Sequence, residues 1–442
     1  MKDDLIGRAN KLFTPALIFH TDIIVKRARG LYIESTYGKR YMDFSSGLAT
    51  TNIGHCPPQV IKAAKKQMDE IIHSGCIFRY KSEIELAEKL KETTPGNLNM
   101  FFFSNSGAEA VEGALKLARF VTKRQGIIAY TGAFHGRTMG ALSLTTSTAR
   151  YRRNYHPLLP SIFRAPYPYC YRCFLGQNPD TCGMDCFEYL KKMLRQEINP
   201  DEVAAIIFEP VLGEGGYAVP PLDYIKELRK LCTEYGIFLI ADEVQTGFGR
   251  TGKWFACEHF GVVPDIMTIA KGIASGFPLS AIASTKEIMS KWLPGAHGTT
   301  FGGNPVSCAA GIATIETIMK DKLLDNAARV GDYAMNYLKD MQKRYPVMGD
   351  VRGLGLMIGI EFVKHAPSEP APDLIRGSKT GKDKIPDKEF LKRVLDKCYK
   401  EGLILIECGI DKNIIRFMPP LITTMGEMKK AIEIFEDAVK TV

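Results

Sequence analysis

The sequence lacks any hydrophobic run long enough to cross a bilayer, and its first ten residues are charged, without the apolar core of a signal peptide. Both absences predict a cytoplasmic protein with no membrane partner. The net charge is only +9, and the basic residues form no aromatic-interleaved stripe, so we expect no nucleic-acid partner. A modest positive charge instead favours small carboxylate substrates. Without an export signal, the 11 cysteines indicate reduced thiols rather than a disulfide framework.

The chain has 442 residues, more than one hydrophobic core usually organises, which predicts two domains. From about residue 99 to 320, apolar strand patterns alternate with helical patterns, as in βαβ units. We expect an N-terminal arm and part of a small domain in residues 1–60, a large domain in 61–320 and the C-terminal small α/β domain in 321–442. Further expected elements are strands near 24–34, 352–363, 403–407 and 414–418, helices near 323–344 and 387–400, and a surface loop at 366–386.

Two short apolar runs each deliver a charged residue at their C-terminal end. The run 238–241 leads to Asp242, and the run 266–270 leads to Lys271. Such runs are typical of buried parallel strands, and the carboxyl ends of these strands form the ligand crevice of open α/β sheets. We therefore place the chemistry at Lys271 and Asp242. Taken singly, each has a plainer interpretation, as a solvated surface lysine and as a helix-capping aspartate.

A third chemical element is the passage from an apolar strand at 102–103 through small polar residues into a helix. The free N–H groups and the positive end of the helix dipole at Ser106, Gly107 and Ala108 would hold a dianionic phosphate. The alternative is an ordinary N-cap without a ligand. The amine, the acid and the anion cup together match the needs of pyridoxal phosphate, whose aldehyde forms a Schiff base with lysine and whose ring nitrogen must stay protonated.

Six motifs then carry a family resemblance. They are FSNSGAEA (103–110), GAFHGRT (132–138), EPVLGEGG (209–216), ADEVQTGFGRTG (241–252), AKG (270–272) and TTFGGNP (299–305). In this order they resemble the class III (ω-amino acid) aminotransferases, in pattern above all the 4-aminobutyrate aminotransferases. The resemblance runs from about residue 27 to the C-terminus. It implies the fold type I architecture of pyridoxal-phosphate enzymes, with a large, mostly parallel seven-stranded sheet, a smaller α/β domain, and a homodimer with shared active sites.

The resemblance also implies roles for individual residues around the cofactor. Lys271 corresponds to the Schiff-base lysine, and Asp242 to the acid that pairs with the ring nitrogen. Gln245 is similar to the residue that hydrogen-bonds the ring hydroxyl, and Phe134 to the aromatic ring that covers the cofactor. His135, beside Phe134, would have a supporting rather than a catalytic role. Thr300 of the other subunit would complete the phosphate cup of Ser106, Gly107 and Ala108.

Substrate recognition, on the same resemblance, involves four residues. Arg416 corresponds to the arginine that binds the α-carboxylate of 2-oxoglutarate or glutamate, and Glu214 to the glutamate that masks it when an ω-amino donor occupies the site. Arg137 corresponds to an arginine that in some members binds the distal carboxylate. The alternative for Arg137 and Glu214 is a structural ion pair. Leu48 stands where 4-aminobutyrate enzymes carry an aliphatic residue and ornithine enzymes a tyrosine, while Leu212 departs from the glutamine of many members.

Four cysteines lie close together in the sequence at Cys170, Cys173, Cys182 and Cys186, with the spacing C-x2-C, x8, C-x3-C. Four thiolates in one loop could form a structural zinc site or hold an iron–sulfur cluster. The central spacing fits no standard zinc finger, so reduced thiols or a redox-sensitive pair are an equal alternative.

The sequence thus predicts a pyridoxal-phosphate aminotransferase that moves the amino group of an ω-amino acid, such as 4-aminobutyrate or 5-aminovalerate, to 2-oxoglutarate. Two alternatives stay open within the family: a racemase or epimerase of α-amino acids, and an acetylornithine or ornithine aminotransferase. A non-catalytic protein that kept the fold would have lost Lys271 or Asp242, and both are present.

Overall fold

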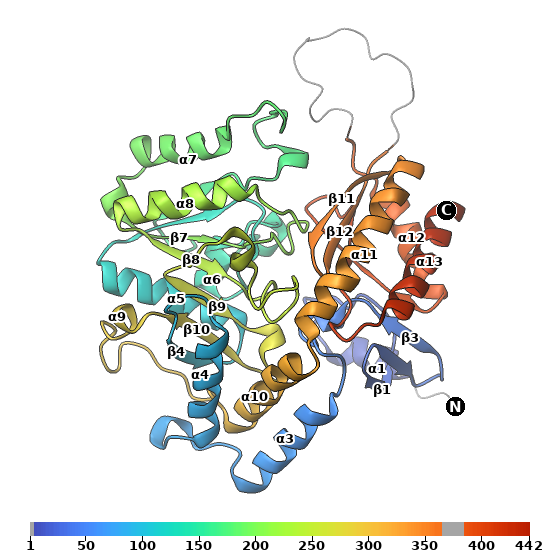
Figure 1. Cartoon of the computed structure of the whole chain (residues 1–442), viewed down its shortest axis with the longest axis horizontal. Coiled ribbons are helices and arrows are strands. Elements are labelled where there is room, and N and C mark those ends of the chain that lie inside the picture. Colours follow the sequence, from blue (N-terminus) through green and yellow to red (C-terminus); the bar gives the residue numbers. More distant parts are fainter. Residues whose placement is uncertain (1–3, 365–383) are drawn as a thin grey trace.

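The computed structural model describes residues 4–364 and 384–442. Its main element is a seven-stranded sheet with the strands β4 (Met100–Ser104), β10 (Ser280–Ser284), β9 (Ile266–Ile269), β8 (Phe238–Asp242), β7 (Val203–Phe208), β5 (Gly126–Tyr130) and β6 (Ile162–Ala165), in that order. β10 runs antiparallel to both of its neighbours, and the other pairs are parallel. The predicted α/β class and the large, mostly parallel seven-stranded sheet are confirmed (Figure 1).

Helices cover both faces of this sheet because successive side chains on a strand point to opposite sides. In β7, Ile206 and Phe208 pack in one cluster with the helices α7 (Asp185–Gln196) and α8 (Leu222–Tyr235). Ala205 and Ile207 point the other way, into a cluster with α5 (Gly107–Thr122). All of β7 is buried, which explains why its sequence is an uninterrupted apolar run.

The second group of elements lies beside the large sheet (Figure 1). It contains the helices α11 (Leu323–Arg344), α12 (Lys388–Lys400) and α13 (Met425–Thr441). The first two confirm the helices expected near 323–344 and 387–400. Two four-stranded sheets complete the group, one with the order β1-β2-β3-β13 and one with the order β11-β12-β15-β14. Their strands are β1 (Val25–Arg29), β2 (Tyr32–Ser35), β3 (Arg40–Asp43), β11 (Met348–Leu354), β12 (Met357–Phe362), β13 (Leu403–Ile404), β14 (Ile406–Cys408) and β15 (Ile414–Phe417).

Two segments expected as single strands are antiparallel hairpins instead. The segment 24–34 turns at Gly30, with φ +57°, between β1 and β2, and the segment 352–363 turns at Gly355, with φ +55°, between β11 and β12. Glycine adopts this left-handed conformation without the steric cost of a Cβ. The expected strand 403–407 is also divided, because β13 pairs with β3 whereas β14 pairs with β15.

The pairing of β3 with β13 joins the N-terminal arm to the C-terminal elements. Farther along the chain, α3 (Pro58–Glu70) and α4 (Lys81–Thr93) pack against α10 (Pro305–Lys320). The domain limits at residues 60 and 320 stay a prediction. The packing of α3 and α4 against α10 places these three helices together, as expected for parts of one large domain. Residues 366–383 of the expected surface loop lie outside the described part of the chain. Every helix of the described ranges is too short or too polar to span a membrane.

Candidate active site

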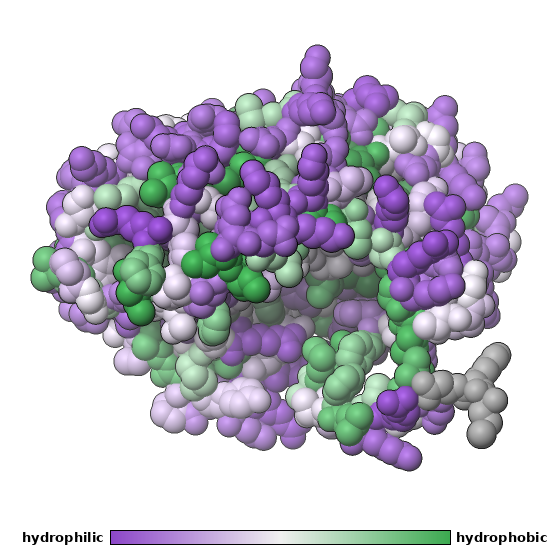
Figure 2. Space-filling model, turned by 90° about the horizontal axis from the view of Figure 1, so that it is seen from below, coloured by the Kyte–Doolittle hydropathy of each residue, from purple (hydrophilic) through white to green (hydrophobic). Residues whose placement is uncertain are grey.

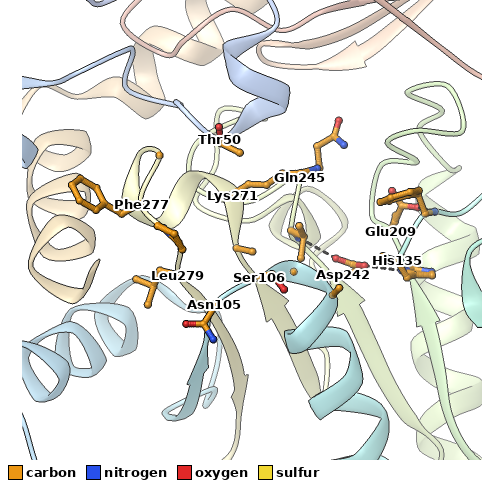
Figure 3. A pocket seen from close by; sticks show the side chains of 18 residues that line it. Thr50, Asn105, Ser106, His135, Glu209, Asp242, Gln245, Lys271, Phe277 and Leu279 are labelled. Atoms are coloured by element: carbon orange, nitrogen blue, oxygen red, sulfur yellow. Dashed lines mark hydrogen bonds and ion pairs between the residues drawn. The ribbon is translucent and has the colours of Figure 1, made fainter. Parts of the chain in front are cut away.

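A cavity of about 390 Å³ lies at the carboxyl ends of β5, β7, β8 and β9, where parallel α/β sheets bind their ligands. Figure 3 shows that side chains from separate strands and loops converge on it. The residues around it are Thr50, Asn105, Ser106, Gly107, Ala108, Phe134, His135, Gly136, Glu209, Asp242, Val244, Gln245, Ala270, Lys271, Gly276, Phe277, Pro278 and Leu279. The cavity therefore brings together the predicted lysine, acid, anion cup, ring-covering residue and glutamine.

Lys271 enters the cavity two residues after the end of β9. Its φ of +46° is a left-handed conformation, which costs a non-glycine residue about 1–2 kcal/mol and aims the side chain away from the strand direction. Burial lowers the pKa of Lys271 to about 8, and the positive charge of Arg416 adds to this effect. The amine is consequently neutral in a substantial fraction of molecules near neutral pH, and a neutral amine is the nucleophilic form.

Asp242 is the last residue of β8 and is almost fully buried. One carboxylate oxygen accepts hydrogen bonds from the Val244 N–H at 3.1 Å and the Thr268 hydroxyl at 3.0 Å, and the other lies 2.7 Å from His135 Nδ1. Burial alone would lower the pKa of His135, but the hydrogen bond and charge of Asp242 outweigh it and raise that pKa. The raised pKa favours the protonated imidazole, whose Nδ1–H donates to Asp242.

The N-terminus of α5 forms the predicted anion cup. The Ser106 side chain caps the helix by accepting from the Glu109 N–H at 3.3 Å. No acceptor within the described ranges occupies the N–H groups of Gly107 and Ala108, which helix geometry leaves free at this end. A Cβ at Gly107 would lie 2.8 Å from a Val244 methyl, and one at Gly136 would lie 2.8 Å from Ala108. Only glycine therefore allows the close approach that exposes these N–H groups to the cavity.

Glu209 is a buried acid of the cavity to which the sequence analysis gave no role. It follows β7 directly, as Asp242 ends β8, so the same strand-end rule could have found it. Its two oxygens accept the N–H groups of Phe134 and Gly213, each at 2.7 Å. Burial raises the pKa of Glu209 to about 7. Glu209 thereby holds the backbone of Phe134 and the start of the loop that carries Glu214.

Glu214 forms an ion pair with Arg416 of β15, as the resemblance implied for the masked state. A β-bridge between Leu212 and Ala218 closes the base of its loop. Leu212, which stands where many family members have glutamine, is buried there and has a structural role. Burial opposes the charge on Arg416, but Glu214 outweighs it and raises the arginine pKa. Because Arg416 also acts on the pKa of Lys271, the ion pair and the amine share one electrostatic environment.

Arg137 is exposed and reaches Glu214 only through a third residue. Its guanidinium lies 4.0 Å from the centre of the Tyr151 ring, and the Tyr151 hydroxyl donates to Glu214 at 3.3 Å. Tyr151 also packs edge-on against Phe134, with ring centroids 5.8 Å apart. No sequence signal marked Tyr151, which stands in a short 3₁₀ turn outside all six motifs.

Five predicted site residues do not line the cavity of this single chain: Leu48, Arg137, Glu214, Thr300 and Arg416. Thr300 is exposed, next to Phe301, which is 60% exposed. Leu48 is 46% exposed and precedes Thr50 of the cavity wall in a turn with left-handed φ at Ser46, Leu48 and Ala49. For Thr300 and Leu48 the expected contacts stay predictions.

The four loop cysteines are free thiols that line a common small cavity of about 150 Å³. Among the residues that the structure describes, no group of three or more Cys, His, Asp or Glu side chains is arranged to hold a metal ion. Burial raises the pKa of Cys170, and it raises that of Cys186 to about 12, so both thiols stay protonated at neutral pH. These free thiols agree with the reduced-thiol alternative, and the zinc or iron–sulfur alternative stays a prediction.

The cavity fits pyridoxal phosphate on several points. The Gln245 Oε1 atom is buried and has no hydrogen-bond partner within the described ranges, so it is available to a hydroxyl on a bound ring. The open N–H groups of α5 suit a phosphate. The side chains of Lys271 and Asp242 line the same cavity (Figure 3). A fold and site of this kind define a pyridoxal-phosphate-dependent enzyme.

Comparison with known proteins agrees with this class. The family model "Aminotransferase class-III" matches residues 18–439. The chain is 40% identical to the alanine/serine racemase of Pyrococcus horikoshii, over 99% of this chain and 90% of that protein. It is 36% identical to a probable 4-aminobutyrate aminotransferase of Bacillus subtilis (94% and 92%) and 38% identical to a 5-aminovalerate aminotransferase of Pseudomonas aeruginosa (94% and 93%). A transaminase structure from Virgibacillus superimposes with a TM-score of 0.88 at 29% identity, covering 99% and 98%.

The chain belongs to the class III aminotransferases. It is a pyridoxal-phosphate-dependent aminotransferase of this family, and the predicted enzyme class, fold type and cofactor are confirmed.

Proposed function

We propose that the enzyme transfers the amino group of a short ω-amino acid, of the 4-aminobutyrate or 5-aminovalerate type, to 2-oxoglutarate. The observation that carries this proposal is the ion pair between Glu214 and Arg416. An arginine that is masked in one half-reaction and free in the other lets one pocket accept two substrates of different charge. Relatives named 4-aminobutyrate and 5-aminovalerate aminotransferases support the choice of donor.

Eight residues of the cavity have a role in this proposal. When bound, pyridoxal phosphate supplies an aldehyde that captures amines and a ring that accepts carbanion charge. Lys271 holds the cofactor until a substrate amine displaces it, and then moves the proton at the amine-bearing carbon as general base. Asp242, supported by His135, keeps the ring nitrogen protonated. The N–H groups of Gly107 and Ala108 hold the phosphate.

The remaining residues orient and select ligands in this proposal. Ser106 completes the cup, Phe134 covers one face of the ring, and Gln245 bonds the ring hydroxyl. During the donor half-reaction Glu214 pairs with Arg416, so the amine-bearing carbon of the donor, which carries no carboxylate, meets no free cation. During the acceptor half-reaction Glu214 swings away, and Arg416 binds the α-carboxylate through two parallel hydrogen bonds. Arg137 attracts the distal carboxylate from its place over Tyr151.

Leu48 favours a donor without a second amine, because an aliphatic side chain offers no acceptor to a charged amino group. An ornithine donor would leave its second amine unpaired beside Leu48. This argues against ornithine and leaves the short ω-amino acids, whose only second group is a carboxylate.

We propose a homodimer in which Thr300 reaches the phosphate cup of the partner subunit. The support is apolar surface beside Thr300. Phe301 stacks on His73 with ring centroids 4.8 Å apart, and Ile72, Ile77 and Phe78 nearby in the sequence are 56%, 78% and 67% exposed. On the face seen in Figure 2, apolar side chains gather around a hollow. Exposed apolar patches of this kind are typical of subunit interfaces.

We also propose a cytoplasmic location, on the evidence of the thiols. All eleven cysteines of the chain are free, in both buried and exposed positions. Unpaired cysteines in this number are typical of a reducing compartment.

A second candidate function is racemisation or epimerisation of α-amino acids. It is favoured by the relative named alanine/serine racemase, at 40% identity, and by one named leucine/methionine racemase, at 38%. A racemase binds a single class of substrate, and each substrate carries an α-carboxylate. It has no need for a gate that masks Arg416, and for this reason we rank it second.

One experiment separates the two candidates. The holoenzyme is incubated with 2-oxoglutarate and a panel of donors: 4-aminobutyrate, 5-aminovalerate, ornithine and N-acetylornithine, with glutamate formation as the readout. In parallel, single L-α-amino acids are followed for loss of optical activity without any keto acid. We expect glutamate from the first two donors and stable optical activity. Loss of optical activity without glutamate formation would instead establish the racemase.

A further inference from the structure

The loop that carries Glu214 is held from outside the cavity by Arg352 of β11. Two nitrogens of its guanidinium donate to the carbonyl oxygen of Gly216, Nε at 3.0 Å and Nη2 at 2.6 Å. The carbonyl of Glu214 itself accepts the N–H of Gly409 at 2.9 Å. The bridge between Leu212 and Ala218 closes the base of the loop. The backbone around Glu214 is thus fixed on three sides, and the Glu214 side chain contacts Arg416 and Tyr151.

Arg352 is in turn oriented by acids. Its Nη1 lies 2.7 Å from Asp350 and 2.9 Å from Glu361, whose side chain is fully buried. Glu361 also accepts hydrogen bonds from the Tyr169 hydroxyl and Arg172. Burial would raise the pKa of Glu361, but Arg352 and Arg172 lower it, so the carboxylate is charged. A buried charge held by several donors has one orientation, because leaving any of its partners unsatisfied is costly.

These contacts connect three parts of the structure in series. Glu361 binds Arg352, and Arg352 binds the loop that carries Glu214. The side chain of Arg352 is 10% exposed and lies over the Tyr169 ring, 4.6 Å from its centre, so it cannot turn to solvent without losing both acids and the ring. A Cβ at Gly216 would lie 3.3 Å from Arg352 Nη2 and 2.7 Å from an Ile414 methyl. A glycine at position 216 therefore gives the guanidinium direct access to the carbonyl.

We propose that Arg352 and Glu361 are positioning residues for the Glu214 gate: they hold the loop 213–217 where Glu214 reaches Arg416, and thereby set which half-reaction the enzyme favours. This inference rests on the proposed function. If the loop backbone is rigid, rotation of the Glu214 side chain is the only motion needed to break the ion pair with Arg416. A loosened loop would lose the masked state first, because the ion pair requires one loop position whereas the open state accepts many.

The expected consequence is a shift in preference between substrates. Arg352→Met removes the two bonds to Gly216, so the masked state becomes less populated and Arg416 is free more often. We expect kcat/KM for the ω-amino donor to fall about tenfold relative to kcat/KM for 2-oxoglutarate, which corresponds to the loss of about 1.4 kcal/mol from the masked state. Arg352→Lys keeps the charge but presents a single ammonium group, so it should give a smaller shift in the same direction.

The two half-reactions are measured separately on the holoenzyme, by the absorbance of the cofactor after mixing with donor alone or with 2-oxoglutarate alone. Arg344→Met is the matched control, since Arg344 pairs with Glu436 at the surface of α11 and has no contact with the loop. If Arg352→Met does not fold, Arg352→Lys carries the test. Equal losses in both half-reactions, or no change in either, would overturn the inference.

A double-mutant cycle tests whether Arg352 acts through Glu214. In a Glu214→Ala background, Arg352→Met should leave the ratio of the two kcat/KM values unchanged, because no gate remains to be positioned. A further tenfold shift in that background would contradict the proposal. Failure of the proposed function is recognised separately: the unmodified enzyme would then transfer no amino group, whereas failure of this inference leaves transfer and the effect of Glu214→Ala intact.

Discussion

The Nδ1 atom of His135 lies 2.7 Å from a carboxylate oxygen of Asp242, and both side chains are almost completely buried. The hydrogen bond and the charge of Asp242 outweigh the effect of burial and raise the pKa of His135. Asp242 is therefore held in one orientation at the end of β8, on the wall of the cavity.

Replacing Asp242 by asparagine should keep the shape of the site and remove the charge. Removal of one preorganised electrostatic group from an active site typically costs about 100-fold or more in rate, and we expect both half-reactions to slow by that factor. Thermal unfolding should show that Asp242→Asn still folds. Asp340→Asn, at an exposed position of α11, is the control. An Asp242→Asn enzyme with normal turnover would exclude the assigned role.

Capture of the cofactor by the apoenzyme should depend on pH with a midpoint near 8, the pKa to which burial and Arg416 lower Lys271. The neutral amine is the reacting form, so the rate of capture should rise as the pH increases through this midpoint. Arg416→Met removes a positive charge that lowers the pKa and leaves Glu214 unpaired, so the midpoint should move to higher pH. A wild-type midpoint at the ordinary lysine value of 10.5, unchanged in Arg416→Met, would contradict this electrostatic account.

Substitution of Leu48 by glycine should stabilise the fold and weaken binding of the ω-amino donor. Leu48 has φ +61° and is 46% exposed, so glycine relieves a left-handed strain of about 1–2 kcal/mol while little apolar contact is lost. We expect a higher free energy of unfolding by about 1 kcal/mol together with a several-fold higher KM for the ω-amino donor. Lys123→Gly is the control, because Lys123 has the same φ of +61° at the end of α5, away from the cavity. Lys123→Gly should gain stability with an unchanged KM; a raised KM in both variants would indicate a general effect of the glycines.

Thiol titration of the denatured protein should find all eleven cysteines reactive. Protein purified without oxygen should contain neither zinc nor iron in a stoichiometric amount, because no three potential ligands among the described residues are placed around a common point. One equivalent of zinc or iron in the native protein would instead mean that Cys170, Cys173, Cys182 and Cys186 bind a metal.

The sequence predicted the large sheet and the centre of the site well because both follow from strand ends. Buried parallel strands have unmistakable apolar runs, and their carboxyl ends lie at one edge, so Lys271 and Asp242 had to be neighbours. The passage from strand into helix added the anion cup, and the resemblance added Gln245. The same rule would also have identified Glu209, had its position after β7 been weighed by itself.

Other features were beyond the reach of local patterns. Apolar alternation continues through the turns at Gly30 and Gly355, so two hairpins resembled single strands. Tyr151 and Arg352 act through contacts with residues 63 and 136 positions away, and such long-range pairs leave no trace in one sequence. The role proposed for Thr300 requires a second subunit, and contacts between subunits cannot be deduced from local patterns in one sequence.

The most direct test of the central claim is to reduce the holoenzyme with borohydride, digest it and locate the modified lysine by peptide mass spectrometry. Borohydride makes the bond between cofactor and side-chain amine permanent. We predict one pyridoxyl group per chain, attached to Lys271. A pyridoxyl group on any other lysine, or no attachment at all in protein reconstituted with pyridoxal phosphate, would contradict the account.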